Sequence, residues 1–330
     1  MKKMKTVVLK EFGEVNNFEF AEVDLPMIKS DEVLIRIMAT AFNPLDYQMR
    51  KGLREKELMV GSILGVEFSG IVVQAGQDTK GFKAGDEVIA CSIQKGSNGS
   101  YAEFIALSFH ELVHKPKNID FGTAASLPVS GMTAWVCYNR MNCKTDEYIF
   151  INGASGGTGR FLILLLMHYK ITNIVVTAGN PESIAMLKGL GILEKNIIDY
   201  NSPDLEQRIL KANQGKEFDH VVDLVGGGIS ETTARVLKVN GNYLDVTFFG
   251  TQTTREILFD KAANILNIAV YSEVVNNKVL NTISELIEGE KLAVPKVNIV
   301  GNLSVATVRK AHELMETNRT RGQKLVMVND

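Results

Sequence analysis

His110, Glu111 and His114 have the types and spacing of a zinc-peptidase site, in which two histidines bind the metal and the glutamate activates its water. That chemistry requires a helix, because only there do residues four apart share a face. The flanking sequence predicts other structure. GSYAEFIALS upstream has a strand pattern, and Pro116 downstream removes a helical N–H and favours extended backbone before it. We therefore expect strand, turn and strand end here, and no peptidase site.

A second stretch, YIFINGASGGTGRFLILLL, has the composition of a phosphate-binding loop between a strand and a helix. Ala154, Gly156 and Gly159 match G-x-G-x-x-G with alanine in the first position. Such a turn lets the backbone approach a pyrophosphate, and the helix N-terminus offers N–H groups and partial positive charge. We expect the dinucleotide to contact the whole loop: Gly153, Ala154, Ser155, Gly156, Gly157, Thr158 and Gly159.

The end of the next strand bears on which dinucleotide binds. An NAD site commonly has Asp or Glu there, bonded to the ribose 2′-hydroxyl. Here the strand ends in VVTAGNPES, and the residues from Thr177 to Asn180 include no carboxylate that would repel a 2′-phosphate. This favours NADPH, although TAGNPES also has no Arg or Lys to bind that phosphate. Alternatively, Asn180 and Ser183 only form a turn and cap the next helix.

The composition narrows the class of protein. The chain has 330 residues, 45% of them hydrophobic, and a formal net charge of -2, so neither disorder nor a polyanion-binding surface is indicated. Cys91, Cys137 and Cys143 are odd in number and form no C-x-x-C pair, which favours a reducing compartment. The longest apolar run, FLILLLM, is too short to span a bilayer, and no signal peptide is recognised. We expect a cytoplasmic protein with neither nucleic acid nor membrane as partner.

The pattern of elements changes along the chain. Up to about residue 120, short alternating runs broken by turns predict an antiparallel β domain. From about residue 123, apolar strands alternate with helices, which predicts a parallel doubly wound sheet. The tail reads as strand, helix and strand. We expect helices over 157–169, 181–190, 203–213, 229–238 and 277–289.

Several motifs together resemble the medium-chain dehydrogenase/reductases, in the zinc-independent quinone oxidoreductase branch. They are AFNPLDYQMRKG, ILGVEFSGIVVQAG, GDEVIA, GSYAEF, AASLPVSGMTAW, GASGGTG and RGQKLV, in the family's order over nearly the whole chain. The resemblance implies an α/β protein with a GroES-like β domain and a Rossmann domain. It places the GroES-like catalytic domain at 1–122, the dinucleotide-binding domain at 123–272, and a return to the catalytic domain at 273–330.

The resemblance also bears on zinc. Where related alcohol dehydrogenases bind catalytic zinc through Cys, His and Cys, this chain has Asn43, Val66 and Ser130. These are not zinc ligands, and the four-cysteine structural lobe is missing, so we expect no metal. Glu67 is retained, and we expect a buried carboxylate paired with a basic neighbour. Without zinc, hydride transfer to a quinone or an α,β-unsaturated carbonyl is favoured over alcohol oxidation.

Site residues follow from the same resemblance. Asn43, Asp46 and Tyr47 are the catalytic candidates, with Asn43 as an orienting donor and Tyr47 either a proton donor or pocket wall. Gln48 stands where related enzymes often have tyrosine. Of the further cofactor contacts, the resemblance implies Thr133 and Tyr200. The expected ends of the strands add Thr177, Asn180, Val225, Gly226, Thr247 and Phe249.

Other hypotheses remain open. The chain could be a non-catalytic NADPH-binding sensor or structural protein, or, with less support, a zinc-dependent alcohol dehydrogenase or a metalloprotein that uses His110 and His114. The stretch NILNIAVYS is expected to form the edge of the nucleotide-binding sheet, where family members pair, so we expect a homodimer. Alternatively, AVYS is a core strand of the monomer.

Overall fold

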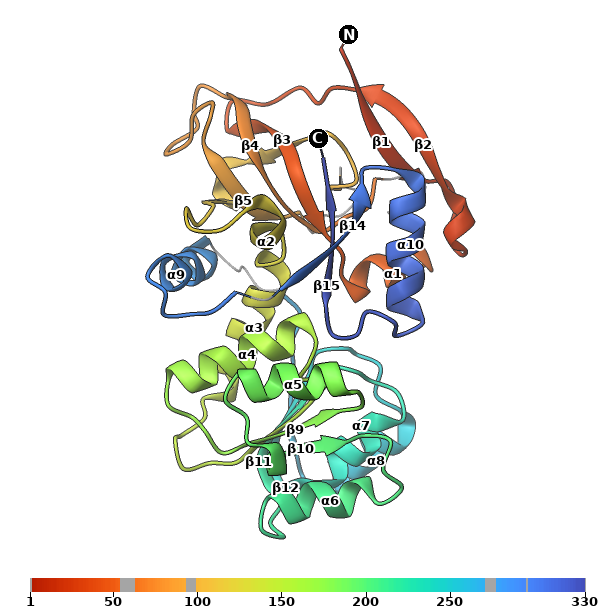
Figure 1. The fold of residues 1–330 in the computed structure, drawn as a ribbon, viewed down its shortest axis with the longest axis vertical. Coiled ribbons are helices and arrows are strands. Elements are labelled where there is room, and N and C mark those ends of the chain that lie inside the picture. The colour runs from red at the N-terminus through yellow and green to blue at the C-terminus, as the bar shows by residue number, and fades with distance from the viewer. Residues whose placement is uncertain (1, 54–62, 93–98, 271–276, 295, 330) are drawn as a thin grey trace. The chain divides into compact units, whose positions relative to one another are not determined.

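The computed structural model describes residues 2–53, 63–92, 99–270, 277–294 and 296–329. The chain divides into two compact units, which Figure 1 shows as ribbons. Unit 1 comprises Met1–Val129 and Val274–Asp330, and unit 2 comprises Ser130–Glu273. Each unit is built around its own main sheet.

Unit 1 is mainly antiparallel. A seven-stranded sheet has the order β14-β15-β3-β4-β5-β7, with β6 paired to β3, and β1 and β2 form a separate ribbon. The tail strand β15 pairs with β3, so the C-terminal segment completes the sheet begun near the N-terminus. The strands are β1 (Lys3–Leu9), β2 (Phe18–Asp24), β3 (Glu32–Ala41), β4 (Glu67–Ala75), β5 (Glu87–Cys91), β6 (Phe104–Ser108), β7 (Leu112–His114), β14 (Val297–Asn302) and β15 (Lys324–Val328).

Helices of unit 1 pack against these strands. They are α1 (Pro44–Arg50), α2 (Phe121–Ala125), α9 (Asn277–Glu288) and α10 (Val305–Glu316), with short 3-10 turns at η1 (Val15–Asn17) and η2 (Phe109–Glu111). Helix α10 lies beside α1 and carries a fully buried His312, whose Nε2 is 3.0 Å from the Tyr101 hydroxyl. This contact helps bind the tail to the rest of unit 1.

The peptidase-like motif forms no helix. His110 and Glu111 lie in the 3-10 turn η2, and His114 ends strand β7. The His114 ring stacks on Phe82, and its Nε2 lies 3.1 Å from the Gly81 carbonyl oxygen. The prediction of strand, turn and strand end is confirmed.

Unit 2 contains a six-stranded parallel sheet of order β10-β9-β8-β11-β12-β13. The strand order reverses between β8 and β11, the position at which doubly wound sheets bind ligands. Its strands are β8 (Ile149–Asn152), β9 (Ile174–Ala178), β10 (Ile197–Asp199), β11 (Phe218–Asp223), β12 (Leu237–Asp245) and β13 (Asn264–Asn267). Its helices are α3 (Pro128–Met141), which begins in unit 1, α4 (Gly157–His168), α5 (Pro181–Gly189), α6 (Leu205–Ala212), α7 (Ile229–Arg235) and α8 (Gln252–Asp260), with a 3-10 turn at η3 (Glu194–Asn196).

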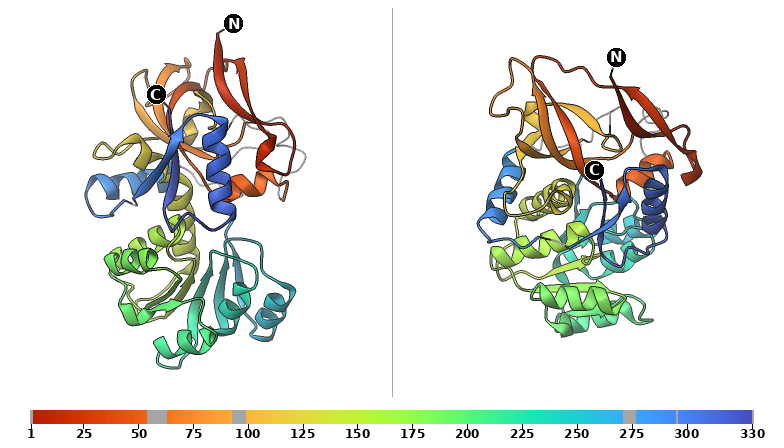
Figure 2. Two further views of the ribbon diagram at one scale, coloured as in Figure 1. Left: turned by 45° about the vertical axis from the view of Figure 1, so that its right-hand side comes forward. Right: turned by 45° about the horizontal axis from the view of Figure 1, so that its top comes forward.

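The crossovers of unit 2 place helices on both faces of its sheet. The chain runs outward from β8 to β10 on one side of the sheet's centre and outward from β11 to β13 on the other. Because the connections are right-handed in both halves, α4 and α5 cover one face of the sheet, and α7 and α8 cover the other (Figure 2). The α/β fold class is confirmed, and the five expected helices are present with ends shifted by at most three residues. Helix α8 is not among those expected, although Thr251 caps its first turn.

Two further expectations concern the sheet edge and the membrane. Strand β13 lies at the edge of the six-stranded sheet, as expected for NILNIAVYS, whereas Tyr271 and Ser272 fall outside the described residues. Among the helices of the described ranges, none is long and apolar enough to cross a bilayer.

Candidate functional site

The glycine-rich loop lies at the carboxyl end of β8, beside the point where the strand order reverses. Gly153 makes the sharp turn, with φ of +68°, a conformation that favours glycine. Gly156 is the N-cap of α4, and no side chain caps that helix. The N-terminal N–H groups of α4 are therefore available for an anion such as a pyrophosphate.

The glycines of the loop have different structural roles. Gly156 has φ of -70°, and a Cβ built on it would meet only the Gly153 carbonyl oxygen, at 3.3 Å. A Cβ on Gly159 would lie 2.6 Å from the backbone of Ala154, so glycine is required there for α4 to pack against the loop. The fold thus requires Gly153 and Gly159, whereas a Cβ at Gly156 would need only a small shift of one carbonyl group.

The end of β9 lies one strand further along the same edge. Thr177 is buried, and the Asn180 Oδ1 accepts a hydrogen bond of 2.9 Å from the Ser183 amide, which caps α5. The capping role considered for these two residues is confirmed. Tyr200 packs over Gly179, where a Cβ would lie 2.2 Å from the ring, so the ring closes this part of the edge.

A carboxylate on the neighbouring strand escaped the sequence analysis. Asp199 pairs with Ala178 across β10 and β9, and its Oδ1 accepts two hydrogen bonds of 2.9 Å from Asn201. Asp199 is visible in the sequence as the third residue of IIDY. Only the pairing of β10 with β9 shows that its carboxylate lies beside the end of β9, the second strand of this sheet along the chain.

The ends of β11 and β12 form the other half of the edge. Buried Asp223 accepts hydrogen bonds from the amides of Val225 and Gly226 and from the Tyr243 hydroxyl, at 3.1, 2.9 and 2.7 Å. A Cβ on Gly226 would meet Thr247 and Phe249, each at 2.8 Å. Val225 remains 54% exposed, and its side chain is 2.8 Å from a Cβ built on Gly153.

All predicted cofactor residues but one therefore lie along the carboxyl edge of a single sheet. The exception is Thr133, which is buried in α3, so its cofactor contact stays a prediction. Asp223, which sequence reasoning missed, fixes the turn that presents Val225 and Gly226. Its only signal was its position within HVVDLVGG, directly before the residues that lead to the glycine pair.

The catalytic candidates of unit 1 belong to a buried polar network. The Asn43 Nδ2 donates to Glu67 Oε1 at 2.8 Å, and the Lys324 ammonium donates to the Asn43 Oδ1. Lys324 also forms an ion pair of 2.6 Å with Glu67, and the amide of Val129 donates to the other Glu67 oxygen at 2.7 Å. The expectation of a buried Glu67 carboxylate with a basic neighbour is confirmed, and that neighbour is Lys324, to which the sequence analysis assigned no role.

Asp46 and Tyr47 lie in α1 and differ in accessibility. Asp46 is fully buried and accepts a hydrogen bond of 2.7 Å from the Asn43 amide, as part of a capping box that begins α1. Burial raises the pKa of Asp46 to about 7, although the Asn43 amide and Lys324 act in the opposite direction. Tyr47 and Gln48 are half-buried. Tyr47 thus retains exposed surface for a substrate, whereas Asp46 is enclosed by protein.

The three positions that the resemblance aligns with zinc ligands carry an amide, a hydrocarbon and a hydroxyl side chain. The Asn43 amide is bonded to Glu67 and Lys324, and Val66 is a buried hydrocarbon side chain in unit 1. Ser130 is buried in unit 2. A cationic side chain thus occupies the neighbourhood of Asn43.

Comparison with known proteins identifies relatives of the whole chain. The family described as alcohol dehydrogenase GroES-like domain matches residues 29–117, and that described as zinc-binding dehydrogenase matches residues 194–326. The chain is 29% identical to the NADPH-dependent alkenal/one oxidoreductase of Arabidopsis thaliana, over 98% of this chain and 80% of that protein. It is 33% identical to a chloroplast envelope quinone oxidoreductase homolog of the same plant, over 71% of this chain and 72% of that protein.

A solved structure agrees with these relationships. The quinone oxidoreductase from Coxiella burnetii superposes with a TM-score of 0.85 at 27% identity, and the match covers 99% of each chain. Both sheets described above thus have counterparts in that protein.

Proposed function

The chain belongs to the medium-chain dehydrogenase/reductase superfamily, and we propose that it is an NADPH-dependent oxidoreductase that reduces quinones or α,β-unsaturated carbonyl compounds without catalytic zinc. Its relatives include proteins named as an alkenal/one oxidoreductase and as quinone oxidoreductases. The partner implied is a small electrophilic molecule.

The observation that carries this proposal is the loop from Gly153 to Gly159 at the reversal point of the sheet. The N-terminus of α4, which no side chain caps, and the lack of a side chain at Gly156 fit a pyrophosphate. Tyr200 and Val225 lie at the same edge of the sheet, where the remaining parts of a dinucleotide would bind. When bound, the nicotinamide supplies a hydride.

The residues of unit 1 suit an electron-poor acceptor. Hydride addition to a conjugated carbonyl leaves negative charge on oxygen, which needs a hydrogen-bond donor or a proton and no Lewis acid. We assign orientation of the substrate to Asn43, held by Glu67 and Lys324, and proton donation to Tyr47. Asp46, being enclosed, acts by fixing the start of α1 on which both side chains depend.

Alcohol oxidation fits these residues less well, although the name of one matching family includes zinc. An alcohol must lose its proton before it yields a hydride, and related enzymes use zinc for that step. Asn43, Val66 and Ser130 offer no thiolate or imidazole for such a zinc. The donor set thus favours reduction of activated double bonds.

A screen of acceptors tests the proposal. Purified protein should consume NADPH in the presence of quinones, enals or enones and should show no oxidation of simple alcohols with NADP⁺. NADPH binding without consumption across all acceptors would support the alternative of a sensor or structural protein. Wild-type activity that disappears in Tyr47→Phe, with NADPH affinity unchanged, would support the role given to Tyr47.

Cofactor preference gives a separate prediction. We expect NADPH to bind at least several-fold more tightly than NADH, and Asn180→Asp to weaken NADPH binding by about 1 kcal/mol, roughly fivefold, through repulsion of the 2′-phosphate. Asp caps a helix as well as Asn does, so α5 should persist. Asn180→Ser, which retains the cap without the charge, is the control.

Fluorescence titration of the wild type and of both Asn180 variants, with NADPH and with NADH, gives the dissociation constants that test this preference. Equal constants for NADPH and NADH would contradict the preference. Tighter binding of NADH would indicate that Asp199 on the neighbouring strand governs the choice. An equal loss of NADPH affinity in Asn180→Ser and Asn180→Asp would assign the effect to the cap and not to charge.

We also propose that the chain forms a homodimer through the edge of β13. Its backbone pairs only with β12 among the described strands, and Ile265 on this strand is 50% exposed. A cavity of about 690 Å³ beside it is lined partly by Phe259, which is 85% exposed, and Tyr243. An apolar, unpaired edge strand favours pairing with a second copy.

Ile265→Lys should convert the dimer into a monomer, because lysine on an edge strand opposes strand pairing. Light scattering coupled to size-exclusion chromatography measures the mass. Val239→Lys, at another exposed apolar position of the same unit, should remain dimeric. A monomeric wild-type protein at micromolar concentration would refute the dimer. We further propose a cytoplasmic location, because the odd number of cysteines and the lack of a C-x-x-C pair favour a reducing compartment.

A further inference from the structure

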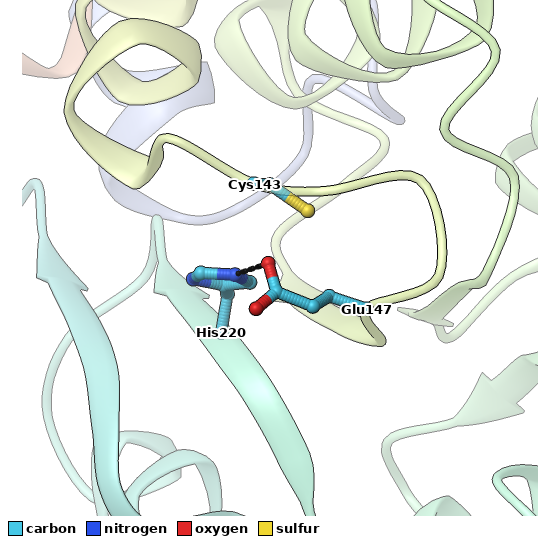
Figure 3. A group of neighbouring side chains, drawn as sticks. All are labelled: Cys143, Glu147 and His220. Carbon is cyan, nitrogen blue, oxygen red and sulfur yellow. Dashed lines mark hydrogen bonds and ion pairs between the residues drawn. The ribbon is translucent and has the colours of Figure 1, made fainter.

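Three side chains capable of binding a metal meet at the amino end of the unit 2 sheet. Cys143 and Glu147 lie in the connection between α3 and β8, and His220 lies in β11 (Figure 3). One ligand atom from each, a thiol sulfur, a carboxylate oxygen and an imidazole nitrogen, all lie within 4.8 Å of one another. Cys143 and Glu147 are half-buried, and His220 is buried.

The surroundings hold these side chains in place. The Glu147 Oε2 accepts hydrogen bonds from the Lys144 amide at 2.8 Å and from the His220 Nε2 at 2.9 Å. On the other side of the ring, the Asn242 amide lies 3.1 Å from the His220 Nδ1. Both the carboxylate and the imidazole are thus oriented before any ion binds, as ligands of metal sites usually are.

This cluster is distinct from the nucleotide edge. His220 pairs with Ile149 at the start of β8, whereas the glycine-rich loop follows Asn152 at its other end. At about 3.3 Å per residue, β8 separates the two ends by on the order of 10 Å. Nothing in the proposed hydride transfer therefore uses Cys143, Glu147 or His220.

We propose that Cys143, Glu147 and His220 bind one Zn²⁺ ion, with water in the fourth position. Thiolate, imidazole and carboxylate are the ligand types that zinc takes in proteins. Around a tetrahedral zinc with Zn–N near 2.0 Å and Zn–S near 2.3 Å, ligand atoms stand about 3.2 to 3.8 Å apart. In this structure the His220 Nε2 and the Glu147 Oε2 are 2.9 Å apart, and the three ligand atoms all lie within 4.8 Å of one another. Small side-chain rotations would therefore bring them to the separations that zinc requires.

Charge and protons balance at the site. One thiolate and one carboxylate neutralise the two charges of the ion, and the imidazole binds as its neutral form. Binding releases the Cys143 thiol proton. Zinc at the Nε2 of His220 requires the ring proton on Nδ1, where the Asn242 Nδ2 now lies. The Asn242 amide must then turn so that its oxygen accepts this proton, and it gives up its present hydrogen bonds to the Met141 carbonyl oxygen and from the Asn264 amide. The nearby Asp219 is already paired with Lys238 and the Tyr148 amide and is not a ligand.

A reactive thiol is the rival interpretation of Cys143. Burial, together with Glu147 and Asp219, raises the pKa of this thiol to about 12, so it is protonated and a poor nucleophile without metal. A bound ion would link strand β11 to the connection that precedes β8. Among these three side chains, the hydrogen bond between His220 and Glu147 makes that link without an ion. The site is therefore structural, and zinc should stabilise unit 2.

Zinc binding by the purified full-length chain tests this proposal. The protein is stripped with a chelator, dialysed against Zn²⁺ and analysed for metal per chain, and Co²⁺ replaces zinc as a spectroscopic probe of thiolate coordination. We expect one ion per chain, a near-ultraviolet thiolate-to-cobalt band, and a Tm several degrees higher with zinc. Cys143→Ser should remove the band and lower zinc affinity at least tenfold.

Matched variants separate this site from other metal-binding groups. Cys91→Ser removes another half-buried thiol and His114→Asn removes a histidine of the peptidase-like motif, and both should bind zinc as the wild type does. Because His220 is almost fully buried, Cys143→Ser in the half-buried connection is the deciding variant, and Glu147→Gln supports it. A wild-type chain without stoichiometric zinc, or a Cys143→Ser variant with unchanged affinity, would overturn the proposal.

Discussion

Gly156→Val should abolish NADPH binding and leave the protein folded. The residue has an ordinary φ of -70°, and a Cβ there meets only one carbonyl oxygen, at 3.3 Å, so the loop can accept a side chain with a small shift. The branched side chain would fill the space through which the pyrophosphate approaches the backbone. We expect an affinity loss of roughly a hundredfold or more, equivalent to about 2.7 kcal/mol. Loss of the glycine N-cap should lower stability by about 1 kcal/mol.

Gly159→Ala is the matched control for this prediction. Its Cβ would lie 2.6 Å from the Ala154 backbone, so it should reduce stability strongly because α4 must move away from the loop. Calorimetry and NADPH titration on both variants distinguish the two roles. A stable Gly156→Val protein with unchanged NADPH affinity would refute the assignment of this loop to the pyrophosphate.

Lys324→Met should destabilise unit 1 more than most single substitutions do. Glu67 is fully buried, and loss of its cation would leave a buried charge whose remaining hydrogen bonds from described residues come from Asn43 and Val129. Removal of one partner from a buried ion pair costs about 3 kcal/mol or more. At about 2–4 °C per kcal/mol for a domain of this size, Tm should fall by roughly 6–12 °C.

A double variant provides the control. Glu67→Gln combined with Lys324→Met removes both charges and should recover much of the lost stability. The glutamine oxygen can accept from the Val129 amide, and its NH2 group can donate to the Asn43 oxygen once the loss of Lys324 allows the Asn43 amide to turn. If Lys324→Met lowers Tm by no more than Lys29→Met, which removes an exposed lysine from a surface pair, the ion pair contributes little to the fold.

The sequence predicted the elements whose signals are local. The strand, glycine turn and apolar helix around Gly156 follow one another directly, so their chemistry could be inferred from one stretch. Pro116 and the alternating pattern before His110 likewise excluded a helix at the peptidase-like motif. The order of the motifs supplied the family and, through it, the architecture of both sheets.

What the sequence left undetermined depends on pairings between distant segments. Glu67 and Lys324 are separated by most of the chain, and only the pairing of β15 with β3 brings the tail to the first sheet. Asp199 can be related to the cofactor edge only through the pairing of β10 with β9. Cys143 and His220 have no common spacing motif, because a connection and a non-consecutive strand bring them together. Periodicity carries no information on such contacts.

Transfer of deuterium tests the central claim most directly. Metal-depleted protein is given an enone and NADPH that is deuterated at the transferable position of its nicotinamide ring, and the product is examined by mass spectrometry and NMR. The account predicts a saturated ketone with deuterium on the β-carbon, formed at the same rate whether or not zinc is restored. A product reduced at the carbonyl carbon to an alcohol, or turnover of the Cys143→Ser variant that requires added zinc, would contradict it.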